Sequence, residues 1–321
     1  MGNIRHPRRG SLQFWPRSRA KYLIARIRSW SPENKAKPLG FIGFKAGMTH
    51  VMAKDNRVKS ITKGEEIALP VTIVECPPMT VAGVSFYKVS SYSGLRKITS
   101  IMAEKQAKEL NKRIPVPKKP VKKFDEITDF EDLRLLVHTN PKRTSIGAKK
   151  PKLLELAIGG SKEEKLAYAK EVLGKEITIK DVFDHDAMVD VHGITIGKGF
   201  QGTVKRYGVP IRQHKAEKTK RGIGNLGSWT PKRVEFTVAQ PGKMGYHLRT
   251  EYNKRILHVG ASGEEVNQKS GITKYGNVKN QFLLVAGSLV GPKKREIVLT
   301  KATRSPVKTV KNPFDIKLIV K

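Results

Sequence analysis

The sequence predicts a mainly β fold that carries a small α+β insertion, an extended N-terminal arm and a long basic internal loop. Short runs rich in Val, Ile and Phe recur along the chain, punctuated by Gly and Pro. No helix pattern follows each run, which indicates an antiparallel barrel or sandwich rather than a parallel sheet. Helical signals gather between residues 100 and 186, and two further segments are too basic and polar to form a core.

Residues 1–38 form the predicted arm, which holds ten basic residues and one acid, Glu33. Arginine forks bind phosphates and flat rings stack on unpaired bases, so this mixture favours an arm threaded through folded RNA over a solubilising tail. The candidate RNA-binding residues here are Arg8, Arg9, Phe14, Trp15, Arg17, Arg19, Lys21, Arg26 and Arg28.

The predicted strands belong to a barrel whose first part is 39–100 and whose second part is 187–321. The apolar or alternating runs that predict them are 39–44, 67–75, 81–89, 188–196, 234–239, 255–259, 281–286, 296–300 and 316–320.

The insertion is predicted over 101–186. Ser161 and Glu164 form a capping box, a helical stripe ends at Leu173, and Gly174 stands where a helix C′ residue belongs. Apolar runs at 133–137, 153–158 and 176–183 complete an α+β pattern, and 114–123 is an extended basic linker. Residues 125–190 hold 14 acids and 11 basic residues, a net of −3, so we expect a solvated segment.

The whole chain carries 63 Lys and Arg against 28 Asp and Glu, a net charge of +35. Self-repulsion of this size is offset by a polyanionic partner, and nucleic acid is the first candidate. A single cysteine, Cys76, excludes an internal disulfide framework and favours a reducing compartment. The N-terminus lacks an apolar stretch of signal-peptide length, so we expect neither export nor membrane insertion; organelle import is a minor alternative, because residues 1–30 also resemble a transit peptide.

Two glycine motifs invite a nucleotide-binding interpretation. Residues 197–202 and 222–227 both match the dinucleotide fingerprint G-x-G-x-x-G. Neither leads into an apolar helix followed by a strand-end acid, so the context fails. The better interpretation is permissive backbone that lies close to phosphates, with Lys198, Lys205 and Arg206 alongside.

The sequence evidence for a metal site or for a nucleophilic residue is also weak. His185, Asp186, Asp190 and His192 could be drawn as a metal cluster, but a solvated strand face is the commoner setting for such residues. Cys76 has no adjacent base and is expected to be a buried bystander. We therefore predict no catalytic residue, no metal and no cofactor.

The segment 198–233 has ten basic residues against one acid, Glu217, and includes six glycines and Trp229. Loops of this length are usually functional, and an indole in the distal part favours a stacking contact. Its candidate RNA-binding residues are Lys198, Phe200, Gln201, Lys205, Arg206, Lys218, Lys220, Arg221, Trp229 and Arg233.

Five segments resemble the large-subunit ribosomal protein L-three family in its archaeal and eukaryotic form: His6–Arg17, Leu39–Thr49, Gly197–Gly202, Gly227–Pro231 and Gly245–Thr250. Val137-His-Thr139 and the helix at 161–173 are similar to that family's insertion. Lys45 and Arg249, within matching segments, complete the candidate RNA-binding set.

The resemblance implies a Greek-key β-barrel of the translation-protein type, a threaded arm, and a loop that reaches toward the peptidyl transferase centre. It also implies an early role in subunit assembly, neighbours such as the ribosomal protein L-fourteen, and a cytoplasmic ribosomal location. One departure is that the family's eukaryotic Lys-Thr-His-Arg-Gly run, with a modifiable His, is here Lys218-Thr-Lys220-Arg-Gly222, so methylation there is not carried over.

The function predicted is thus a non-catalytic, RNA-binding structural protein of the large ribosomal subunit, with no membrane or small-molecule partner. One alternative is an RNA-modifying enzyme with basic extensions, which would need a convergent acid/base or cofactor constellation. Another is a DNA architectural protein, which lacks support because no groove-reading helix is predicted.

Overall fold

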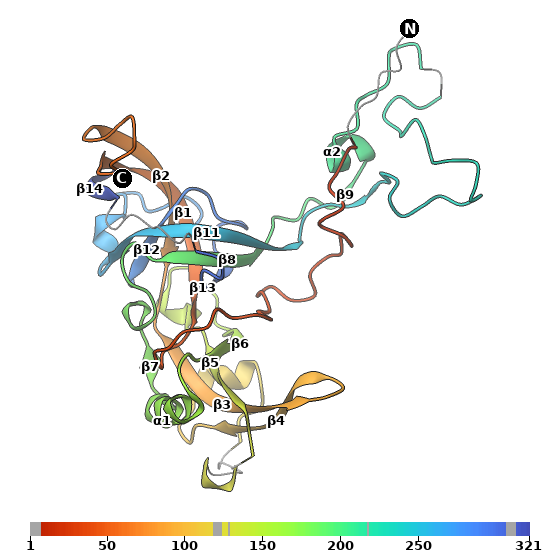
Figure 1. The fold of residues 1–321 in the computed structure, drawn as a ribbon. Helices are drawn as coiled ribbons and strands as arrows, with labels where there is room; N and C mark the ends of the chain where they lie inside the picture. The colour runs from red at the N-terminus through yellow and green to blue at the C-terminus, as the bar shows by residue number, and fades with distance from the viewer. Residues whose placement is uncertain (1–7, 118–123, 128, 217, 306–312) are drawn as a thin grey trace. The chain divides into compact units, whose positions relative to one another are not determined.

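A computed structural model of the chain describes residues 8–117, 124–127, 129–216, 218–305 and 313–321. The chain divides into two compact units (Figure 1). The basic unit consists of residues 1–22 and 194–249, and the β unit consists of residues 23–193 and 250–321. The fold is mainly β, as the sequence predicts. Within the described residues, no helix is both long and apolar enough to cross a membrane.

The largest sheet has seven strands in the order β13-β8-β11-β12-β2-β1-β14. An additional pairing of β13 with β1 closes six of these strands into a ring, and β14 is added at the other half of β1. The strands are β1 (Gly40–Asp55), β2 (Glu66–Glu75), β8 (Met188–Ile194), β11 (Leu248–Gly260), β12 (Phe282–Ala286), β13 (Glu296–Lys301) and β14 (Phe314–Ile319).

The ring forms because its strands are rich in β-branched and aromatic residues, whose side chains are buried on both faces of the sheet in two core clusters. Phe41, Val74 and Leu283 are fully buried members of one core cluster, and Phe44 and Phe282 belong to a second. Full burial of such a side chain stabilises the fold by about 1.5–3 kcal/mol. The run predicted at 39–44 is the start of a strand that continues to Asp55.

A second sheet has the order β4-β3-β5-β6, and β7 also pairs with β3. Its strands are β3 (Met79–Ser90), β4 (Gly94–Met102), β5 (Asp132–His138), β6 (Leu153–Ala157) and β7 (Glu176–Ile177). The segment predicted as the insertion therefore shares its sheet with β3 and β4, which precede it in the chain.

Helix α1 (Lys162–Val172) confirms the capping box predicted from the sequence. The Ser161 hydroxyl accepts from the Glu164 amide, and the Glu164 carboxylate accepts from the Ser161 amide. Gly174 follows with φ +80°, a conformation that side chains disfavour. The shorter 3-10 turns are η1 (Lys108–Lys112), η2 (Phe124–Glu126), η3 (Pro141–Arg143), η4 (Ile179–Asp181) and η5 (Gly263–Glu265). Most of the predicted linker 114–123 lies outside the described residues.

The basic unit has little regular structure. A two-residue ladder joins β9 (Phe200–Gln201) to β10 (Gly242–Lys243), and α2 (Thr203–Tyr207) follows β9 directly. The strand predicted at 234–239 is wrong, since these residues form turns and coil. Alternation needs a partner strand to become a ladder, and Phe236 instead packs edge-on against Trp15, with ring centroids 5.6 Å apart.

The arm is divided between the two units after Tyr22. Residues 24–30 are extended along the core of the β unit, where Ala25 and Ile27 are buried. Arg26 and Arg28 alternate with them and are exposed. The second half of the predicted arm is thus anchored by its own apolar side chains.

Candidate RNA interface

Positive charge is concentrated in the basic unit. Its residues include 18 Lys and Arg and two acids, Glu217 and Glu235, a net of +16 out of +35 for the chain. The β unit, with three times as many residues, holds the remaining +19. A surface of one sign attracts and concentrates a polyanion, so the basic unit is the candidate interface.

The structure brings the arm together with the loop and with residues 246–247 within this unit (Figure 1). The Ala20 amide donates to the Tyr246 carbonyl at 2.8 Å, and His247 Nδ1 lies 2.9 Å from the Ser18 carbonyl. The Arg17 guanidinium donates to the Arg206 carbonyl at 3.2 Å. Two segments predicted separately to bind RNA therefore form one surface.

The Tyr207 side chain is only 6% exposed, and residues of both the arm and the loop pack against its ring. The guanidinium carbon of Arg17 lies 4.2 Å from its ring centroid, and that of Arg206 lies 5.1 Å away. Gly10 approaches the same ring so closely that a Cβ there would lie 2.2 Å from it. Arginine over a partly desolvated ring contributes about 0.5–2 kcal/mol, so these contacts hold the arm on the loop.

Arg206 is further engaged inside the protein, because its guanidinium donates to the carbonyls of Gln240 and Lys243. Arg17 also donates to the Ser11 carbonyl. Both were predicted as RNA contacts, but their guanidinium groups are occupied by protein partners. In the structure, Arg17 and Arg206 hold segments of the basic unit together.

Aromatic side chains of the arm also have partners in the unit. Phe14 lies under the Arg249 guanidinium, 4.7 Å from its carbon, and stays 55% exposed. Burial, and secondarily the charge of Arg17, lowers the pKa of Arg249. Trp15 Nε1 is buried and has no hydrogen-bond partner within the described residues.

Most other predicted contacts are exposed to solvent and available to a partner. Trp229 is 83% exposed and Phe200 is 72% exposed. Trp229 therefore does not pack in a hydrophobic core. The remaining exposed members in this unit are Arg8, Arg9, Arg19, Lys21, Lys198, Lys205, Lys218, Lys220, Arg221 and Arg233. Gln201 is half-buried and donates to the Lys198 carbonyl at 2.6 Å.

Lys45 does not belong with this set. Its side chain is buried in the β unit, and its ammonium donates to the Leu289 carbonyl and, at 3.0 Å, to the Gly291 carbonyl. Burial lowers the pKa of Lys45. A register shift between Lys45 and Gly47 marks a bulge in β1, and such bulges redirect side chains. We therefore withdraw Lys45 from the proposed RNA-binding residues.

The residues drawn as a possible metal cluster have structural partners. His192 Nδ1 lies 2.9 Å from the Thr250 hydroxyl, and Nε2 lies 3.0 Å from the Thr300 hydroxyl. Asp190 is buried, not solvated as expected, and accepts from the Asn253 and Thr303 amides, both at 2.9 Å. Burial lowers the pKa of His192. Among the described residues, no group of three His, Cys, Asp or Glu is arranged to hold a metal ion.

Cys76 is buried, as expected, and burial raises the pKa of its thiol well above the ordinary value. A thiol held neutral is a poor nucleophile.

The sequence analysis did not predict Tyr207, Tyr246 and Lys243, whose contacts organise the basic unit. Tyr246 lay within a segment quoted for the resemblance, but no periodicity linked it to the arm.

Comparison with known proteins gives matches over nearly the whole chain. The family model described as ribosomal protein L3 matches residues 1–319. The large ribosomal subunit protein uL3 of Methanocaldococcus jannaschii is 46% identical over 319 residues, covering 97% of this chain and 95% of that protein. The proteins of the same name from Methanosphaera stadtmanae and Methanococcus aeolicus are each 45% identical, covering 96% and 94% of this chain and 94% and 92% of their own lengths.

Proposed function

Because this chain belongs to the ribosomal protein L3 family, we propose that it binds and organises large-subunit ribosomal RNA through its basic unit. Membership of the family makes it a structural protein of the large ribosomal subunit in the cytoplasm and not an enzyme. The alternative of an RNA-modifying enzyme is thereby set aside.

The observation that carries the proposal is the concentration of +16 charge on one unit built from arm and loop. Arginine and lysine side chains on this surface replace the counterions of RNA phosphates, and the released ions drive binding. RNA helices that repel one another can then lie close together on either side of the unit. Phosphate contacts fix position, while the exposed rings of Phe200 and Trp229 reach unpaired bases.

The finer parts of the proposal follow from the resemblance. They are a closed barrel of the Greek-key type, early action in subunit assembly, a loop near the peptidyl transferase centre, and contact with the ribosomal protein L-fourteen. The ring of six strands supports the first of these, since the β13–β1 pairing leaves it without open edges.

Sedimentation tests the proposal. A tagged chain expressed in a related archaeon is expected to sediment with large subunits in a sucrose gradient and to remain there after a moderate-salt wash. A variant in which exposed basic residues of the loop are replaced by glutamine should be depleted from that fraction. Recovery of the wild-type chain only at the top of the gradient would contradict the proposal.

A further inference from the structure

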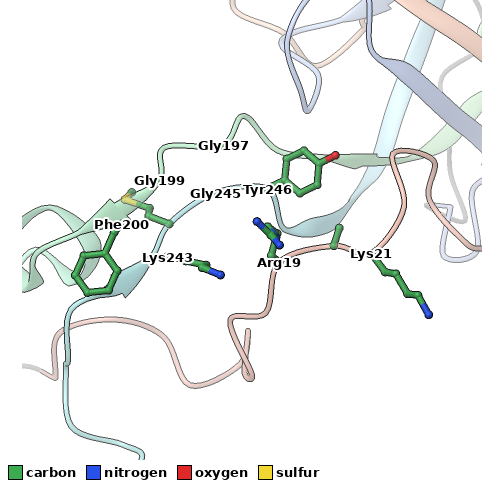
Figure 2. Close-up of a pocket in the computed structure, with 10 residues that line it drawn as sticks. Arg19, Lys21, Gly197, Gly199, Phe200, Lys243, Gly245 and Tyr246 are labelled. Atoms are coloured by element: carbon green, nitrogen blue, oxygen red, sulfur yellow. The ribbon is translucent and has the colours of Figure 1, made fainter.

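An open hollow of about 770 Å³ lies in the basic unit, between the arm and the glycine-rich start of the loop (Figure 2). Three segments line it, and they contribute residues 19–21, then Gly197, Gly199 and Phe200, then residues 243–246. Backbone hydrogen bonds join them: Lys198 N donates to Met244 O at 2.9 Å, and Ala20 N donates to Tyr246 O at 2.8 Å. Its size falls within the roughly 300–1,000 Å³ typical of sites for small organic groups.

The lining is suited to an anion. Three of its ten residues are basic, and none is acidic. Figure 2 shows the Arg19 and Lys243 side chains at the hollow and the Lys21 side chain directed away from it. Two cations without a neighbouring carboxylate in the lining present the pattern that a phosphate group fills.

The lining is also suited to a flat ring. Phe200 is 72% exposed and stands directly opposite Lys243 in the β9–β10 ladder. Tyr246 lies at the other side of the hollow, beside Arg19 (Figure 2). An exposed phenyl ring beside an ammonium group offers a stacking face next to a phosphate contact, which is the combination that single-stranded nucleic acid uses.

Glycines keep one wall free of side chains. Gly245 has φ +74°, and a Cβ there would lie 2.1 Å from the Ile196 carbonyl oxygen, so no other residue fits. Gly197 is different, because its backbone is not left-handed and a Cβ there would meet Tyr246 at an ordinary 3.7 Å. A larger residue at position 197 is therefore compatible with the backbone and would occupy the hollow.

We propose that this hollow is a nucleotide pocket that takes one unpaired nucleotide of RNA, with its base against Phe200 and its phosphate between Arg19 and Lys243. The proposal rests on the proposed function and narrows it to a class of ligand. A base within a duplex is stacked on both faces and cannot enter, so the pocket selects single-stranded RNA.

Equilibrium binding by the full chain tests this, with oligouridylate as the single-stranded probe and an RNA duplex of equal length as the reference. Replacing Phe200→Ala should weaken oligouridylate binding about 5- to 150-fold, the range for removal of one base–aromatic stack, and leave duplex binding within about twofold. Phe200→Tyr should restore it. Gly197→Leu, which fills the pocket without changing charge, should have the same selective effect.

Tyr92→Ala is the matched control for the loss of an exposed aromatic ring, since Tyr92 is 99% exposed and belongs to the β unit, outside the proposed interface. It should change neither affinity. If the wild-type chain binds neither RNA, the proposed function fails. If it binds both, and Phe200→Ala or Gly197→Leu leaves oligouridylate binding unchanged or weakens both RNAs equally, the pocket is overturned while the proposed function stands. Loss with Arg19→Gln and Lys243→Gln but not with Phe200→Ala would show an anion site only and would also overturn it.

Discussion

The guanidinium carbon of Arg17 lies 4.2 Å from the centroid of the Tyr207 ring, so that a residue of the N-terminal arm stacks on a residue of the internal loop. The same guanidinium donates to the Arg206 carbonyl at 3.2 Å. This contact joins two segments within one unit of net charge +16, which is the physical basis for the proposed RNA interface.

We expect Arg17→Ala to loosen the arm. The substitution removes the stack on Tyr207, worth about 0.5–2 kcal/mol, and its carbonyl contacts, so residues 8–22 should become more sensitive to limited proteolysis in the free protein. Arg9→Ala, which removes an exposed charge from the same arm, is the control and should leave the cleavage rate unchanged. Equal rates in the two variants would refute the anchoring role of Arg17.

Trp229→Ala should leave stability nearly unchanged and weaken RNA binding. The indole is 83% exposed, and surface substitutions usually alter the free energy of unfolding by less than about 0.5 kcal/mol. Loss of one stacked base costs about 1–3 kcal/mol of binding free energy. Thermal melts and RNA titrations of the same preparation separate the effects, and a large fall in Tm with normal RNA affinity would contradict this role.

Lys45→Met is expected to lower stability and to leave RNA binding unchanged, the reverse of Trp229→Ala. The buried Leu289 carbonyl and the half-buried Gly291 carbonyl lose their ammonium donor, and an unsatisfied buried polar group costs about 1–3 kcal/mol of stability. RNA affinity of the folded variant should equal that of the wild type. A selective loss of RNA affinity at unchanged Tm would return Lys45 to the interface.

Acid should destabilise the turn between β1 and β2 through Asp55. This buried carboxylate accepts from the Arg57 guanidinium at 2.8 Å and from the Thr62 hydroxyl at 2.7 Å, and the Arg57 contact holds the pKa of Asp55 far below its usual range. A depressed carboxyl pKa contributes stability above the unfolded value of about 3.9, and that stability is lost as pH falls below it. Tm should therefore fall below about pH 4 less steeply in Asp55→Asn than in the wild type, and parallel Tm curves would contradict this.

Local signals predicted several parts of the fold well. The capped helix after Ser161 needs only neighbouring residues, and the β-branched runs behind β2, β3, β8, β12 and β13 are long enough to specify strands. The run at 234–239 has the same alternation but no partner strand, which its own sequence could not reveal.

The site was harder to predict because residue type does not specify a distant partner. Arginine is equally suited to a phosphate and to the ring of Tyr207, and only the folded chain shows that Arg17 and Arg206 take the ring. Lys45 stands in an apolar run whose bulge turns it inward. The sequence predicts a stacking contact for Trp229, and its side chain is 83% exposed and so accessible to a partner.

The salt dependence of RNA affinity tests the central claim most directly. The logarithm of the binding constant of the full chain for a large-subunit RNA fragment should fall linearly with the logarithm of salt concentration. Replacing Lys205, Lys218, Lys220 and Arg221 with glutamine should reduce the steepness of that slope by up to about 0.7–0.9 for each phosphate that the variant no longer neutralises. Reversing the charge of four acids within 125–190 should leave the slope unchanged. A slope that is flat in the wild type, or that responds to the acids and not to the basic residues of the loop, would contradict the claim that the basic unit binds RNA.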